Sequence, residues 1–185
     1  MSQAISASVQ DEARRLRDAL GTFATGVVIV TAWDEEAGAL GMTMNSFSSV
    51  SLDPPLVLFS VDRRSMGLPA WQRTAGYCIN VLSSDQERLS NQFARARGDK
   101  WNGVSFRIGL HGAPILSDTL ASFECDAHQM LDGGDHVVFL ACVQRFRRSD
   151  SGSPLLFHRG RYASLLPQAG AEHALPFEWP LSIHY

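Results

Sequence analysis

A long strand pattern, a tight turn and a second long strand pattern occupy the region from Phe123 to Phe146. Mostly apolar residues recur at every second position from Phe123 to Leu131, as in a strand with one buried face. Asp-Gly-Gly-Asp at 132–135 is typical of a tight β-hairpin turn. The return segment, HVVFLACVQRF, is apolar on both faces, which predicts a strand in the middle of a sheet. This hairpin predicts an antiparallel sheet.

Shorter patterns predict the rest of the fold. Dense β-branched or apolar runs, and a further run leading into Thr43, indicate strands at 27–33, 56–61, 77–82 and 155–165. About seven strands arranged in hairpins, without regular strand–helix–strand alternation, predict a mainly β fold. We expect an antiparallel barrel with peripheral helices.

Three helices are expected around the strands. An apolar stripe over residues 8–20, followed by Gly21, predicts the first helix and its end. The second should begin near Ser65. Ser84, with Glu87 three residues later, forms a capping-box pattern at the start of the third.

Composition narrows the class of protein. The chain has 185 residues, enough for one domain, and its net charge of −3 gives no basic surface for nucleic acid. Three cysteines at wide spacing indicate neither a disulfide framework nor a zinc site, which fits a reducing cytoplasm. The N-terminus has no apolar signal-peptide core, and no apolar run is long enough to span a bilayer. We therefore expect a cytoplasmic protein.

The C-terminal residues have a pattern of their own. Apolar side chains occupy every second position from Leu175 to Tyr185, while Pro176 and Pro180 exclude an ordinary strand ladder. We expect residues 1–166 to form the domain and residues 167–185 to form an extended arm on a neighbouring surface. An unstructured end is the alternative.

The residues after the 56–61 strand form a candidate phosphate site. Ser60, Arg63, Arg64 and Ser65 place hydroxyls and guanidinium groups where a helix should begin, and helix N-termini favour anions. The local alternative is an ordinary helix cap with solvated arginines.

The stretch TMNSFSSVSLDPP, residues 43–55, is polar yet strand-like. Serine and asparagine side chains loosen regular pairing. At a barrel rim they present donors and acceptors in a line, which suits a planar heteroaromatic ligand such as a flavin. A serine-rich loop is the alternative. His136, after the Gly133–Asp135 turn, is a candidate ligand or proton-transfer residue, or simply a hydrogen-bonded rim side chain. The spacing of histidines and cysteines indicates no metal site and no catalytic triad.

Taken together, these pieces resemble the flavin reductase-like family, whose fold is the FMN-binding split barrel. The resemblance extends over residues 15–166. It rests on FATGVVIVTA (23–32), GMTMNSFSSVSLDPPLVLFSV (41–61), RRS (63–65), NQFA (91–94), GDH (134–136) and LLFHRGRY (155–162).

The resemblance implies a homodimer and a set of site residues. His136, in the catalytic role, and Tyr162 would face the nicotinamide. The flavin would be bound by Thr43, Met44, Asn45, Ser46, Ser49, Val50, Ser51, Ser60, Arg63, Arg64, Ser65, Phe93, Lys100 and Tyr162.

The implied function is that of an NAD(P)H:flavin oxidoreductase. It would reduce FMN or FAD with NADH or NADPH and supply reduced flavin to a separate flavin-dependent monooxygenase. Two alternatives stay open at this point. One is a flavin-binding protein of this fold without nicotinamide turnover, acting in electron transfer, sensing or storage. The other is a split barrel that binds another planar ligand such as haem.

Overall fold

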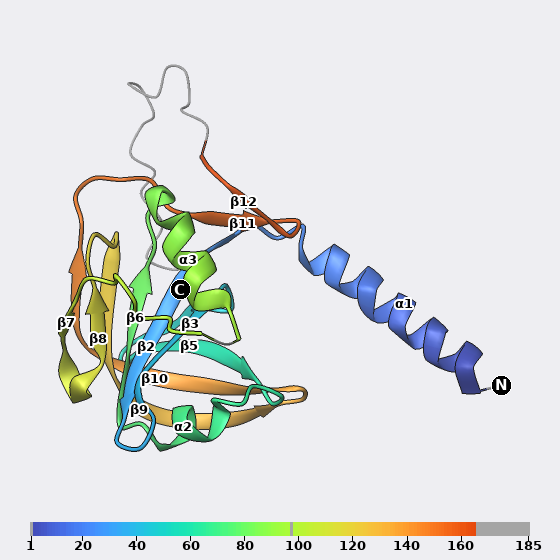
Figure 1. Ribbon diagram of the computed structural model, residues 1–185, viewed down its shortest axis with the longest axis horizontal. Coiled ribbons are helices and arrows are strands. Elements are labelled where there is room, and N and C mark those ends of the chain that lie inside the picture. The colour runs from blue at the N-terminus through green and yellow to red at the C-terminus, as the bar shows by residue number, and fades with distance from the viewer. Residues whose placement is uncertain (1, 97, 166–185) are drawn as a thin grey trace.

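The computed structural model describes residues 2–96 and 98–165 of the chain, with side chains from residue 11 onward. Its main sheet has seven antiparallel strands in the order β3-β2-β6-β9-β10-β5-β4 (Figure 1). The edge strands β3 and β4 are consecutive in sequence, so the barrel is split between them. The strands are β2 (Val28–Asp34), β3 (Gly38–Met44), β4 (Ser48–Leu52), β5 (Pro55–Asp62), β6 (Gly76–Val81), β9 (Ala121–Gly133) and β10 (His136–Arg148).

Smaller elements surround this sheet. β1 (Thr25–Gly26), β11 (Leu156–His158) and β12 (Arg161–Ala163) form a three-stranded sheet, and β7 (Phe106–Ile108) pairs with β8 (Pro114–Leu116). The helices are α1 (Ser2–Leu20), α2 (Leu68–Arg73) and α3 (Glu87–Ala94), with 3-10 turns η1 (Ser84–Gln86) and η2 (Leu110–Gly112). The predicted mainly β architecture with peripheral helices is confirmed.

The long hairpin forms as predicted, with two irregularities. β10 lies between β9 and β5, so its central position is confirmed. Register shifts between Leu140 and Ala141 and between Val143 and Arg145 break the strict alternation. Ser122 and Glu124 lie on the opposite face of β9 from Cys125, as the alternation predicts. Both are nevertheless buried, at 4% and 6% exposure, so β9 is buried on both faces here rather than on one.

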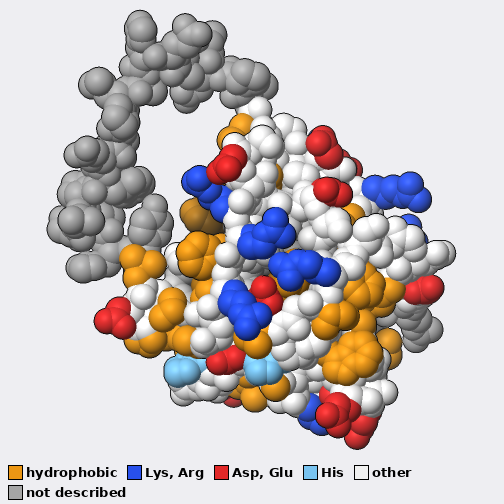
Figure 2. Space-filling view, turned by 90° about the vertical axis from the view of Figure 1, so that its left-hand side faces the viewer, with side chains coloured by type: hydrophobic (Ala, Val, Ile, Leu, Met, Phe, Trp, Pro, Cys, Tyr) orange, Lys and Arg blue, Asp and Glu red, His pale blue; other side chains and the backbone are white. Residues whose placement is uncertain are grey.

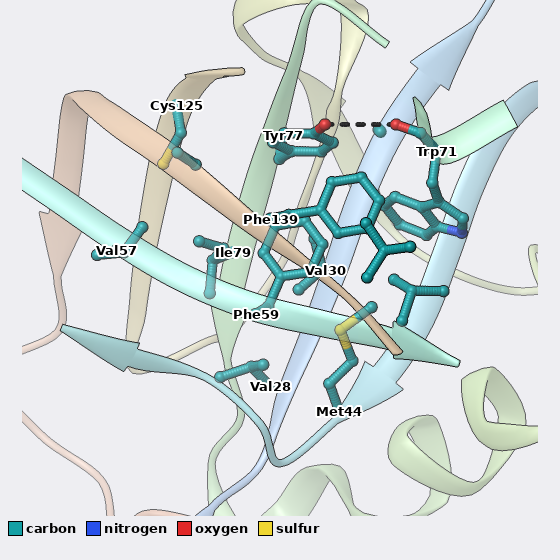
Figure 3. Close-up of a cluster of buried hydrophobic side chains, with 14 of the residues drawn as sticks. Val28, Val30, Met44, Val57, Phe59, Trp71, Tyr77, Ile79, Cys125 and Phe139 are labelled. Atoms are coloured by element: carbon teal, nitrogen blue, oxygen red, sulfur yellow. Dashed lines mark hydrogen bonds between the residues drawn. The ribbon is translucent and has the colours of Figure 1, made fainter. Parts of the chain in front are cut away.

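The main core lies inside the barrel (Figure 3). Phe59 and Phe139 stack with ring centroids 5.1 Å apart, and Tyr77 meets Phe59 edge-on at 5.0 Å. The Tyr77 hydroxyl donates a hydrogen bond to the Trp71 carbonyl at 3.3 Å, which satisfies the polar end of a buried ring. Since Trp71 belongs to α2, this packing fixes α2 against the barrel.

Three helix predictions need correction. α1 begins at Ser2 rather than residue 8 and extends away from the barrel (Figure 1). α2 begins at Leu68 rather than near Ser65, because residues 62–65 form a turn in which the Ser65 N–H donates to the Asp62 carbonyl. The capping pair is Ser83 with Gln86, one residue before the predicted pair; the Ser83 N–H donates to Gln86 Oε1 at 3.1 Å.

The predicted strand at 155–165 is a hairpin, β11–β12. Its turn contains Arg159 and Gly160, both with positive φ (49° and 75°), which reverses the chain. Residues 167–185, the predicted arm, lie outside the described residues. Among the helices that the structure describes, none is long and apolar enough to cross a membrane.

Arg73 at the end of α2 is ion-paired with Asp34 at the end of β2. Its Nη2 lies 2.8 Å from Asp34 Oδ1, and Nε lies 3.1 Å from Oδ2. These hydrogen bonds lower the pKa of the Asp34 carboxyl below its ordinary 3.8. A lowered carboxyl pKa contributes stability above the ordinary value, and the contribution is lost as pH falls through the folded-state value.

We therefore expect Arg73→Leu to reduce the free energy of unfolding at pH 7, with a loss that shrinks as pH falls below 3.8. Urea unfolding of wild type and variant at several pH values measures this. Arg14→Leu, on the exposed face of α1, is the control. A loss that stays constant across the pH range would contradict the assigned ion pair.

Candidate functional site

The polar stretch after β3 crosses the split in the barrel. β3 ends at Met44, which is buried in the core at 7% exposure, and β4 begins at Ser48. Phe47 packs on Phe123 with ring centroids 6.0 Å apart. The Ser60 N–H donates to Ser46 Oγ at 3.0 Å, which ties the crossing to β5. The crossing is thus held at both ends, and β3 and β4 each have one edge free of a strand partner within the main sheet.

β4 carries three more of the residues that were predicted to bind the flavin, Ser49, Val50 and Ser51. Ser49 pairs with Val57 and Ser51 with Leu56, so Val50 is the extra residue of a bulge. Ser49 and Val50 are exposed, whereas Ser51 is half-buried. A bulge on an edge strand re-aims side chains and backbone groups, which is a common device beside binding sites.

A groove of about 910 Å³ lies beside this crossing. It is lined by β3, the turn before α2, the end of α3 and residues 98–101. Five of the predicted site residues come together here from distant parts of the sequence. They are Thr43, Arg64, Ser65, Phe93 and Lys100.

Lys100 is held at the base of its loop by backbone acceptors. Its Nζ donates to the carbonyls of Gly41 and Phe93, each at 3.1 Å. Burial lowers the pKa of the Lys100 ammonium. An ammonium has three donors, so one N–H remains for an anion in the groove. This geometry supports the predicted contribution of Lys100 to the charge of the site.

Phe93 and Trp101 form an aromatic wall of the groove. Their rings meet edge-on with centroids 4.9 Å apart, and Trp101 Nε1 donates to the Ala39 carbonyl at 3.0 Å. A Cβ on Gly41 would lie 2.3 Å from Phe93 Cε1. Gly41 is therefore the position that lets the Phe93 ring lie against β3. Sequence reasoning did not single out Gly41 or Trp101 as site residues, because the role of each depends on where the fold places the Phe93 ring.

The two arginines of the candidate phosphate site have different roles. Arg64 lines the groove and pairs with Asp62 at 2.7 Å, which holds the pKa of the Asp62 carboxyl well below its usual range. Arg63 instead donates to the Gly134 carbonyl at 2.8 Å and lies 3.0 Å from Asp132. Arg63 therefore holds the β9–β10 turn in place and is not among the groove-lining residues. The candidate phosphate site is formed by a turn, not by a helix N-terminus.

Tyr162 is linked to the groove indirectly. Its hydroxyl lies 2.8 Å from Ser90 Oγ and donates to Asn91 Oδ1 at 3.2 Å. The Thr43 hydroxyl donates to the Ser90 carbonyl at 2.6 Å. This places Tyr162 behind Thr43, against α3, rather than in the lining of the groove. Asn45 lines a different cavity of about 720 Å³, which it shares with Thr25.

His136 is the first residue of β10, directly opposite Asp62 of β5 in the ladder. Its Nδ1 lies 2.7 Å from Asp135 Oδ1, and its side chain is 41% exposed. The hairpin thus presents an oriented, accessible imidazole next to the turn that carries Arg64. Among the described residues, no three His, Cys, Asp or Glu side chains are placed to bind a metal together.

Known proteins share both the sequence and the fold. Residues 20–166 match the flavin reductase like domain. A probable flavin reductase of Rhizobium meliloti is 44% identical over 149 residues, 80% of this chain, although this chain spans only 48% of that longer protein. The reductase subunit HsaB of a flavin-dependent monooxygenase from Rhodococcus jostii is 36% identical, covering 90% of this chain and 83% of the subunit.

The solved structures agree. The NADH:FAD oxidoreductase of Streptomyces globisporus, solved in complex with NAD and FAD fragments, has a TM-score of 0.81 and 34% identity, covering 86% of this chain and 96% of that one. The fold and the matched domain point to the same family of proteins. The chain belongs to the flavin reductase-like family.

Proposed function

We propose that this chain is an NAD(P)H:flavin oxidoreductase that supplies reduced FMN or FAD to a separate flavin-dependent monooxygenase. The observation that carries the proposal is the groove beside the barrel split. There a lysine with one donor free for an anion, a serine and an arginine come together from different segments of the chain. Relatives named as flavin reductases and as monooxygenase reductase subunits support the same activity.

The groove suits the phosphate end of a flavin. Lys100 supplies a positive charge fixed by two backbone carbonyls, and the Ser65 and Thr43 side chains lie along the same groove. Charge-assisted hydrogen bonds to a phosphate are stronger than neutral ones, and a preorganised ammonium loses little entropy on binding. The pair Arg64–Asp62 is exposed on the arginine side, so Arg64 is free to turn toward a bound phosphate.

The split suits the flavin ring. The crossing at Asn45 and Ser46 and the bulged strand at Ser49–Ser51 present hydroxyls and edge backbone groups. Bound flavin supplies the hydride-accepting chemistry. The protein orients the two rings and keeps them in place, and His136 holds the nicotinamide side through an imidazole oriented by Asp135. Because the flavin supplies the reactive group and the protein only binds and orients, the site needs no catalytic triad.

The same proposal includes a homodimer in the cytoplasm. Leu16 and Leu20 on α1 are 61% and 67% exposed, and Leu52 on the edge strand β4 is 80% exposed. α1 extends away from the barrel (Figure 1), so a second copy offers these apolar side chains a surface to pack on. The three cysteines are free, which fits a reducing compartment.

The activity is tested by mixing the purified protein with NADH or NADPH and with FMN, FAD or riboflavin. We expect the absorbance of the reduced nicotinamide at 340 nm to fall only when a flavin is present. The reduced flavin, once mixed with O2 and an added flavin-dependent oxygenase, should support turnover by that oxygenase. Omitting the flavin is the control. Tight flavin binding without nicotinamide oxidation would contradict the proposed reductase activity.

A further inference from the structure

A second hollow lies between the β7–β8 hairpin, the start of β9 and the end of β10. Its volume is about 460 Å³, and it shares no lining residue with the flavin groove. Figure 2 shows Lys and Arg side chains gathered in the middle of the face that carries β7 and β8. The lining consists of Phe106, Arg107, Ile115, Leu116, Ser117, Asp118, Thr119, Ala121, Ser122, Arg147, Arg148 and Ser149.

One of the three arginines in this hollow has an uncompensated charge. Arg107 Nη2 faces Glu124 Oε1 at 3.9 Å, and Arg148 Nη2 faces Asp150 Oδ1 at 3.1 Å. Arg147 forms no ion pair with any described residue. A guanidinium presents a planar fork of donors that matches a carboxylate. Arg147 is therefore the group in this hollow that is available for an anion.

A nearly buried hydroxyl lies next to Arg147. Ser122 is 4% exposed and stands directly opposite Arg147 in the β9–β10 ladder, so both side chains point to the same face of the sheet. Within the described part of the chain, the Ser122 hydroxyl takes part in no hydrogen bond. The Ser122 oxygen is open to the hollow, because among the described residues the only fully buried side-chain oxygen or nitrogen without a partner is Thr25 Oγ1. An oxygen atom of a ligand bound to Arg147 would accept a hydrogen bond from it.

The opposite wall of the hollow is apolar and fixed in place. Phe106 packs edge-on against Trp101 with ring centroids 5.2 Å apart. Ile115 and Leu116 belong to β8, which is anchored because the Leu116 N–H donates to Asn80 Oδ1 at 2.9 Å. Ile115 and Leu116 are only 4% and 3% exposed, so Phe106, at 40%, is the apolar side chain that a ligand in the hollow can contact.

We propose that this hollow binds a small organic monocarboxylate. The carboxylate accepts hydrogen bonds from Arg147 and Ser122, and the apolar body lies against the exposed ring of Phe106. Asp118, the only carboxylate in the lining, disfavours a second negative charge on the ligand. The proposal is independent of flavin reduction, because none of these residues lines the flavin groove.

Isothermal titration calorimetry with benzoate tests the proposal, with benzamide as the uncharged analogue. We expect Arg147→Ala to weaken benzoate binding by about tenfold or more, and Ser122→Ala by about threefold, from the loss of one charged and one neutral hydrogen bond. Arg145→Ala is the matched control, since Arg145 lies on the same strand but outside the lining. All three variants should keep the wild-type rate of NADH oxidation with flavin.

Three outcomes would overturn the proposal. Equal benzoate affinity in wild type and Arg147→Ala would remove the assigned anion contact. An equal loss in Arg145→Ala would show a general effect of surface charge. Benzamide or inorganic phosphate binding as tightly as benzoate would exclude the assigned ligand class. Each outcome can be read even if the chain failed to reduce flavin, because calorimetry does not depend on turnover.

Discussion

Lys100→Met is expected to weaken FMN binding by about 10- to 100-fold, the usual effect of removing one charge-assisted hydrogen bond. The variant keeps an unbranched side chain of nearly the same length and removes its charge and donors. The carbonyls of Gly41 and Phe93 hold the wild-type Nζ in place, so little side-chain entropy is lost when its remaining N–H binds the phosphate. The variant therefore loses nearly the whole free energy of that hydrogen bond. Fluorescence titration of FMN measures the affinity.

Riboflavin, which lacks the phosphate, separates the two roles of Lys100. If Lys100 binds the phosphate, riboflavin affinity should change by less than about threefold while FMN affinity falls. Arg88→Met, an exposed cation on α3 outside the groove, controls for long-range charge. An equal loss for FMN and riboflavin would show that the lysine only supports the loop. A lower thermal melting temperature of the variant would report this supporting role, because the carbonyls of Gly41 and Phe93 lose their hydrogen-bond donor.

Local patterns predicted the strands and turns well. The Asp-Gly-Gly-Asp turn fixes the hairpin by its own backbone preferences, and the apolar return strand occupies the centre of the sheet. The bulges in that hairpin have no signal in the sequence, because they arise where β9 and β10 must curl around the core. The burial of Ser122 and Glu124 has another cause: η2 and the β7–β8 hairpin cover the second face of β9, which alternation alone could not predict.

Sequence reasoning named five of the residues that line the groove but not how they are arranged. Arg63 and Arg64 are adjacent and identical in type, so no local rule distinguishes the one that lines the groove from the one that clamps the hairpin. The difference comes from tertiary contacts with Gly134 and Asp132. Gly41 and Trp101 were missed for the same reason: their role depends on the position of Phe93, which the fold alone determines.

His136→Ala is expected to slow hydride transfer to flavin by about 10- to 100-fold, because a small misplacement of reacting groups has an effect of that size. His136 begins β10, and its Nδ1 lies 2.7 Å from Asp135 Oδ1, so the ring is oriented before any substrate arrives. Flavin affinity should change by less than about twofold, since His136 does not line the flavin groove. Anaerobic stopped-flow absorbance at saturating NADH measures the rate.

His128→Ala, which removes an exposed histidine from β9 of the same hairpin, is the matched control and should keep the wild-type rate. Asp135→Asn separates orientation from the imidazole itself. If Asp135 acts by orienting the ring, the variant should lie between wild type and His136→Ala, because the ring is retained but its charged partner is lost. Equal hydride-transfer rates in wild type and His136→Ala at saturating NADH would remove His136 from the reaction, and the nicotinamide would then be oriented by the barrel split alone.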